Sequence, residues 1–119
     1  MNYRHAFHAG NFADIWKHVI LMAALEALNR KASPWAYVDT HAGAGLYALD
    51  AQEAARTGEW RDGIGRILDR RDVPDAIAHY LSAVTDAGAG RYPGSPWLAM
   101  QTSPRNTSIL LTSRSGTPA

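Results

Sequence analysis

The segment 39–45, with the sequence DTHAGAG, places an acid, a histidine and two glycines in one short turn. Gly43 and Gly45 allow a backbone to bend sharply and to approach a ligand that a larger side chain would block. An acid at the end of a strand, followed by such a turn, is typical of nucleotide pockets in open α/β sheets. The full glycine fingerprint would need a third glycine where this chain has Ala48. The spacing leaves two interpretations open, a pocket for a nucleotide-type ligand and an ordinary tight turn.

Other residues that could do chemistry lie on both sides of this turn. Histidines occur at positions 5, 8, 18, 41 and 79, but neither a cysteine nor a cluster of carboxylates completes a metal-ligand set, so we expect no metal site. His41 could contact a ligand of the turn or simply face solvent. Ser95 lacks the glycine two residues later that a nucleophile elbow requires, so helix capping or a ligand hydrogen bond fits it better. Tyr3, Arg4 and His5 could contact unpaired RNA bases or form an ordinary frayed terminus.

Composition bounds the kind of protein. The chain has 119 residues, of which 46% are hydrophobic, and its formal net charge is +1. This length indicates one domain or part of one, and the small net charge does not by itself indicate a nucleic-acid-binding protein. The absence of cysteine excludes disulfides, thiolate metal sites and cysteine nucleophiles. No apolar run approaches the length of a membrane span, so we expect a soluble cytoplasmic protein.

Hydrophobic periodicity predicts the elements that position these residues. A helix is expected over 12–30, capped by Asn11, with an apolar stripe at positions 15, 19, 22, 25 and 28 and with His18 pointing away from that stripe. A strand follows Pro34 and ends at Asp39. Helices are also expected over 60–71 and 74–86 and from about residue 97 with Ser95 as its cap, whereas 46–55 could be helix or loop.

The end of the chain differs from the rest. Residues 102–119 contain no acid, and only their Ile109, Leu110 and Leu111 could bury side chains, so we expect a disordered tail. Residues 108–112 are the one further candidate strand. Because a single strand does not make a sheet, the chain is either a small helical domain or the front part of a larger α/β fold, and the second is more economical.

Eight irregular strings of this sequence resemble a known bacterial family, the large-subunit ribosomal RNA methyltransferases of the J type. The strings are YRH at 3–5, FHAGN at 7–11, AD at 13–14, KH at 17–18, DTHAGAG at 39–45, RTGE at 56–59, GI at 63–64 and YPGSP at 92–96. Together they cover about residues 3–100, the N-terminal part of such proteins, and the resemblance is expected to stop near Gln101.

The resemblance implies an enzyme that methylates the exocyclic N6 amine of one adenine in 23S rRNA with S-adenosyl-L-methionine. It implies a Rossmann-like class I methyltransferase fold that begins over 1–55, carries a small helical insertion over 56–90 and resumes over 91–101, before the atypical tail 102–119. Four residues match positions at the cofactor, His18, His41, Gly43 and Ser95, and Tyr3 matches a position at the RNA substrate. The implied protein is a monomer whose partner is 23S rRNA, with no membrane association.

One motif of the family is absent. The resemblance requires an Asp/Asn-Pro-Pro-Tyr/Phe motif that holds the target amine, and this sequence has no Pro-Pro pair and no acid after Asp86. We therefore assign no catalytic residue and expect a truncated form, without the catalytic half, that is inactive alone. Two alternatives remain, a non-catalytic remnant that binds RNA or a nucleotide and a fragment without function.

Overall fold

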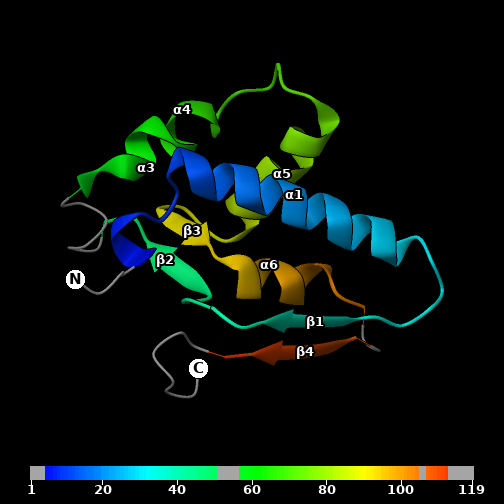
Figure 1. Ribbon diagram of the computed structural model, residues 1–119. Coiled ribbons are helices and arrows are strands. Elements are labelled where there is room, and N and C mark those ends of the chain that lie inside the picture. The colour runs from blue at the N-terminus through cyan, green and yellow to red at the C-terminus, as the bar shows by residue number, and fades with distance from the viewer. Residues whose placement is uncertain (1–4, 51–56, 105–106, 113–119) are drawn as a thin grey trace.

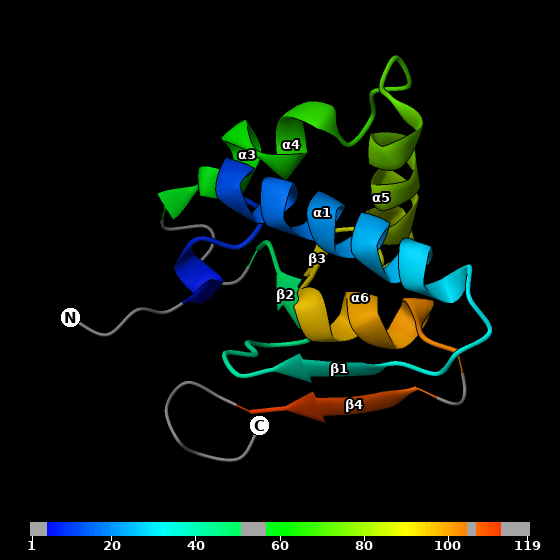
Figure 2. The same cartoon turned by 45° about the vertical axis from the view of Figure 1, so that its right-hand side comes forward.

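The long helix α1 (Phe12–Asn29) runs through the middle of the computed structural model, which describes residues 5–50, 57–104 and 107–112 (Figure 1). Asn11 caps this helix as expected, because its side chain accepts a 2.9 Å hydrogen bond from the amide of Asp14. On one side of α1 lie the helices α3 (Glu59–Asp62), α4 (Ile64–Ile67) and α5 (Asp75–Asp86). On the other side lies α6 (Ser95–Thr102), which separates α1 from the strands β1 (Ala36–Asp39) and β4 (Ser108–Leu111) (Figure 2).

The buried face of α1 differs from the stripe predicted by hydrophobicity. It consists of Asp14, His18, Met22 and Leu25, whereas Leu28 of the predicted stripe is 42% exposed. The expectation that His18 points away from the apolar stripe is therefore wrong, since His18 is only 1% exposed and lies on the same buried face as Met22 and Leu25. The predicted stripe included only apolar residues. The helix also buries the polar side chains of Asp14 and His18, which have hydrogen-bond partners in other elements.

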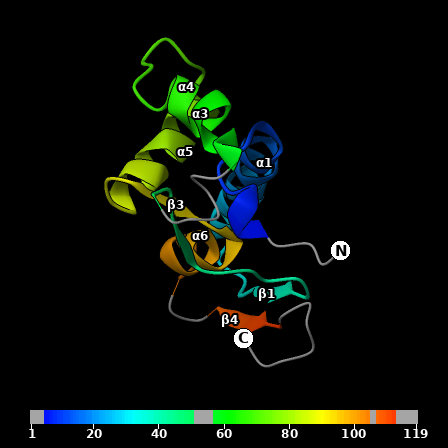
Figure 3. The same ribbon diagram turned by 90° about the vertical axis from the view of Figure 1, so that its left-hand side faces the viewer.

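Two pairs of short strands flank the turn that follows β1 (Ala36–Asp39). β1 was expected, and it pairs in parallel with β4 (Ser108–Leu111) in a register that sets Val38 opposite Leu110. β2 (Leu46–Ala48) pairs antiparallel with β3 (Arg91–Pro93), so the expectation of helix or loop over 46–55 is wrong at 46–48, and 51–55 lie outside the described residues. The two pairs form separate two-stranded sheets, and β1 and β4 lie side by side below α6 in Figure 3.

The expectation of a disordered tail over 102–119 is wrong at β4. Ile109 and Leu111 are half-buried, and the backbone of β4 uses the hydrogen-bonding edge of β1. Two further bonds extend this pairing, from the amide of Thr112 to the carbonyl of Asp39 and from the amide of Ala42 to the carbonyl of Thr112, both 2.9 Å. The candidate strand at 108–112 is thus confirmed over Ser108–Leu111, while 105–106 and 113–119 lie outside the described residues.

The helix predicted over 60–71 is instead two short helices, α3 (Glu59–Asp62) and α4 (Ile64–Ile67). The break falls at Gly63, where a Cβ atom would lie 2.1 Å from the carbonyl oxygen of Gly10. The amide of Ile64 donates to that same carbonyl at 2.9 Å. The break therefore serves to dock the start of α4 on the start of α1.

The remaining helices share one core with α1. α5 (Asp75–Asp86) lies within the expected range 74–86, and α6 (Ser95–Thr102) begins two residues before the expected 97. Tyr80 of α5, Tyr92 of β3 and Leu98 of α6 are completely buried together. A short 3₁₀ turn, His5–Phe7, precedes α1. Among the described residues, no helix is long and apolar enough to cross a membrane.

Candidate cofactor-binding site

Asp39, the last residue of β1, connects three parts of the turn region. Its Oδ1 accepts a 3.1 Å hydrogen bond from the amide of His41, as expected for an acid that caps a turn. Its Oδ2 accepts hydrogen bonds from the Ser95 hydroxyl at 2.7 Å and from the Tyr37 hydroxyl at 3.0 Å. Burial raises the pKa of Tyr37 to about 12, so its hydroxyl remains a donor. The expected cap role of Ser95 is wrong, because no side chain caps α6 and the Ser95 hydroxyl binds Asp39 instead.

Two glycines allow the turn to lie against the start of α6. A Cβ atom at Gly43 would lie 2.2 Å from the hydroxyl of Tyr47, and one at Gly94 would lie 2.4 Å from the carbonyl oxygen of Ala44. The amide of Gly94 also donates to the carbonyl of Gly45 at 2.8 Å. A side chain at position 43 would therefore displace the Tyr47 hydroxyl, whereas no atom lies within 4 Å of a Cβ built at Gly45.

All four residues expected at the cofactor line one cavity of about 190 Å³ beside this turn. His18 comes from α1, His41 and Gly43 from the turn, and Ser95 from α6. The other lining residues are His5, Lys17, Tyr47, Gly94 and Pro96. Tyr3, expected at the RNA substrate, lies outside the described residues.

A larger groove of about 450 Å³ lies elsewhere, between α1 and α4. Its walls are mainly apolar and include Phe12, Trp16 and Ile67. We favour the smaller cavity as the candidate site because recognition of a polar ligand needs convergent polar groups, and these line the cavity beside the turn.

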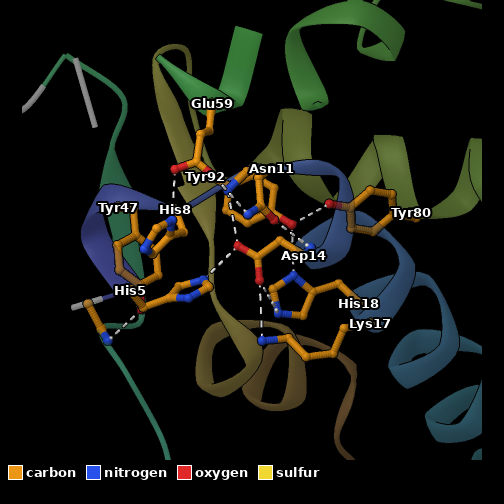
Figure 4. Close-up of polar contacts among 12 residues, drawn as sticks. His5, His8, Asn11, Asp14, Lys17, His18, Tyr47, Glu59, Tyr80 and Tyr92 are labelled. Carbon is orange, nitrogen blue, oxygen red and sulfur yellow. Dashed lines mark hydrogen bonds and ion pairs between the residues drawn. The ribbon is translucent and has the colours of Figure 1, made fainter. Parts of the chain in front are cut away.

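His18 forms one end of a buried chain of hydrogen bonds (Figure 4). Its Nδ1 and the Tyr92 hydroxyl are 2.8 Å apart, and the hydroxyls of Tyr92 and Tyr80 are 2.7 Å apart. Burial lowers the pKa of His18 to about 4 and raises the pKa of both tyrosines above the ordinary range. At neutral pH all three side chains are therefore uncharged.

Asp14 is the charged centre next to this chain, and its side chain is buried. Its Oδ2 accepts hydrogen bonds from His5 Nε2 at 2.7 Å and from the amide of Gly10 at 3.0 Å, and Lys17 Nζ lies 3.2 Å from its Oδ1 (Figure 4). Burial raises the pKa of Asp14. The hydrogen bond from His5 and the charges of the nearby histidines together lower this pKa by more than burial raises it, so it lies below its ordinary value. The Asp14 carboxylate is therefore ionised at neutral pH.

Sequence reasoning did not assign Asp14, Lys17 or Tyr92 to a site. The sequence did contain a signal for Asp14 and Lys17. Asp14, Lys17 and His18 are three and four residues apart and so share one helix face. Tyr92 gave no local signal, since its partners come from α1 and α5. Within the described part of the chain, no group of three or more His, Cys, Asp or Glu side chains could hold a metal ion.

A family model described as "Ribosomal RNA large subunit methyltransferase D, RlmJ" matches residues 32–115. The chain belongs to this family. The match includes β4, so the expectation that the resemblance stops near Gln101 is wrong. The chain thus resembles RlmJ proteins both in the turn after β1 and in the strand that pairs with β1.

Two curated relatives and one solved structure are similar to this chain. It is 42% identical over 106 residues to ribosomal RNA large subunit methyltransferase J of Haemophilus influenzae and 46% identical over 103 residues to that of Escherichia coli. These alignments cover 85% and 83% of this chain but only 38% and 37% of the relatives. The crystal structure of protein LPL1258 from Legionella pneumophila, of the family DUF519, superposes with a TM-score of 0.80 at 32% identity, covering 89% of this chain and 40% of that one.

Proposed function

We propose that this chain forms part of the S-adenosyl-L-methionine pocket of a Rossmann-like class I methyltransferase that acts on the N6 amine of an adenine in 23S rRNA. The observation that carries the proposal is the convergence of His18, His41, Gly43 and Ser95 on one cavity at the carboxyl end of β1. This is the edge at which α/β folds bind nucleotide-type ligands. Membership of the RlmJ family supports the reaction and the RNA substrate.

The residues present suit a polar cofactor with an amino-acid part. Lys17 supplies a cation at the cavity wall, and the Ser95 hydroxyl, which donates to Asp39, keeps lone pairs for a ligand N–H or O–H. His41 Nδ1 lies 2.9 Å from the Thr40 hydroxyl, which leaves Nε2 for a ligand. A cavity of about 190 Å³ is smaller than the roughly 300–1,000 Å³ usual for a whole ligand of this size, so we assign it part of the cofactor.

When bound, S-adenosyl-L-methionine supplies an electrophilic methyl group. The residues of this chain bind and orient that cofactor, and positioning of this kind can supply much of the rate of a group transfer. We propose that Tyr3, which precedes His5 of the cavity wall, contacts the RNA substrate. No residue of this chain is assigned to hold the target amine, because the Asp/Asn-Pro-Pro-Tyr/Phe motif is absent from the sequence.

The 119-residue chain alone is expected not to methylate RNA, because its sequence lacks the Asp/Asn-Pro-Pro-Tyr/Phe motif that would hold the adenine amine. The measurement is incorporation of a labelled methyl group from S-adenosyl-L-methionine into naked 23S rRNA, followed by nucleoside analysis. A homologous full-length enzyme of the family serves as the positive control. Cofactor-dependent N6-methyladenosine formed by the purified chain would contradict this prediction.

Cofactor binding is expected to survive weakly and to depend on His41. Replacing His41 with alanine should weaken binding of S-adenosyl-L-homocysteine about tenfold, as expected for loss of a ligand hydrogen bond of about 1.4 kcal/mol. Isothermal titration calorimetry measures the change. His79→Ala is the matched control, since His79 lies on α5 outside the cavity lining and pairs with Glu26 of α1. Equal affinities for the two variants would show that the pocket is wrongly assigned.

A further inference from the structure

The buried chain from Tyr80 through Tyr92 to His18 contains one proton on each hydroxyl and one on the neutral imidazole, and two orders of these protons use the Tyr92 proton in a hydrogen bond of the chain. In the first order, Tyr80 donates to Tyr92, and Tyr92 donates to His18 Nδ1. In the second, His18 Nδ1 donates to Tyr92, and Tyr92 donates to Tyr80. The distances, 2.7 Å and 2.8 Å, permit either order.

The surroundings distinguish the two orders. The second leaves the Tyr80 proton without an acceptor, because among the described residues its hydroxyl bonds only that of Tyr92 and its side chain is 0% exposed. In the first order the Tyr80 hydroxyl donates its proton, and only its acceptor lone pairs lack a hydrogen-bond partner. A buried donor without an acceptor costs about 1–3 kcal/mol, and buried donors without partners are rarer than under-used acceptors. Satisfying every hydroxyl proton therefore requires the first order.

The charge beside His18 favours the same order independently. His18 Nε2 lies 4.0 Å from Oδ1 of the ionised Asp14, too far for a hydrogen bond but close enough for a strong electrostatic effect. A lone pair on Nε2 would face a negative charge, whereas an N–H group there is stabilised by it. The first order puts the imidazole proton on Nε2.

We propose that Tyr80 and Tyr92 are positioning residues that hold His18 as its Nε2–H tautomer, so that His18 presents a hydrogen-bond donor to a carboxylate oxygen of a ligand in the cavity. His18 lines the cavity, and no other described residue hydrogen-bonds its Nε2. Lys17 in the same wall adds a positive charge that suits an anionic oxygen. The ligand part of this inference rests on the proposed function, in which that oxygen belongs to the amino-acid part of the cofactor.

The tautomer is tested on the ligand-free chain by long-range ¹H–¹⁵N NMR at pH 7. The His18 signals, identified by their loss in His18→Gln, are expected to show an unprotonated Nδ1 and a protonated Nε2. The Nδ1 signal should then move toward the value of a non-hydrogen-bonded nitrogen in Tyr92→Phe. Tyr80→Phe should shift it less and leave the tautomer unchanged, because Tyr92 still donates to His18. A protonated Nδ1 in the wild-type chain, or in Tyr80→Phe, would overturn the assignment.

The ligand part is tested by adding two compounds to the same sample. S-adenosyl-L-homocysteine is expected to shift the His18 Nε2–H signal, whereas 5′-methylthioadenosine, which lacks the carboxylate, should not. Tyr92→Phe should bind the first compound about tenfold more weakly, because the ring loses the partner that orients it. Binding by calorimetry without an Nε2–H shift would overturn the ligand contact alone. A complete absence of binding would count against the proposed function and leave the tautomer assignment standing.

Discussion

Replacing Gly63 with alanine is expected to lower the free energy of unfolding by about 3 kcal/mol, the upper end of the cost of overpacking a close contact. A Cβ atom at this position would lie 2.1 Å from the carbonyl oxygen of Gly10 and 2.8 Å from backbone atoms of Asn11. Both neighbours are backbone at the start of α1, so neither can move without shifting that helix. Relief of the clash would also break the hydrogen bond from the amide of Ile64 to Gly10.

Urea denaturation followed by circular dichroism measures the change, and Gly45→Ala is the matched control. No atom lies within 4 Å of a Cβ at Gly45, and its φ is not positive, so the control should change stability by less than about 0.5 kcal/mol. Equal midpoints for the two variants would show that the α4 break does not dock on the start of α1.

Lowering the pH from 7 to 4 is expected to reduce the free energy of unfolding by about 3 kcal/mol through His18 alone. The pKa of this histidine is about 4 in the folded chain and 6.5 in the unfolded chain. Between these values the unfolded chain binds a proton that the folded chain does not, so stability falls as the pH drops below 6.5 and this loss ends near 4. A difference of roughly 2.5 pKa units corresponds to about 3 kcal/mol.

The measurement is the urea midpoint at a series of pH values, with His18→Gln as the comparison. Glutamine cannot titrate and retains an acceptor for the Tyr92 hydroxyl, so its stability should change much less between pH 6.5 and 4. The Asp14 pKa is lowered on folding, so its stabilising contribution is lost only as the pH falls below its ordinary value of 3.8, outside this range. An identical pH slope in both proteins would contradict the assignment to His18.

Both predictions concern contacts near the start of α1. The Gly63–Gly10 contact holds α3 and α4 on the start of α1, and the next turn of α1 carries Lys17 and His18 to the cavity wall. Tyr80 of α5 is linked by hydrogen bonds through Tyr92 of β3 to His18 in the cavity wall. Residues outside the cavity can therefore affect how a ligand is bound.

The sequence alone determined the features that depend on neighbouring residues. The cap at Asn11 and the apolar periodicity predicted α1, Pro34 and the β-branched and aromatic run predicted β1, and Pro74 marked the start of α5. The resemblance of the strings at 17–18, 39–45 and 92–96 to a known family also implied His18, His41, Gly43 and Ser95 as a group, and these four residues line one cavity. Helix caps, strand-forming runs and short motifs each depend on a few neighbouring residues, so they can be recognised in a sequence before its fold is known.

Only the tertiary structure decided the features that depend on distant partners. The tail forms β4 because β1 offers it a parallel edge, and the helix expected over 60–71 breaks because Gly10 lies against Gly63. His18 is buried because Tyr92 satisfies its Nδ1 and burial makes the neutral ring the stable form. Each of these outcomes follows from a hydrogen bond or a steric contact between segments far apart in the chain, and hydrophobic patterns carry no information about such pairs.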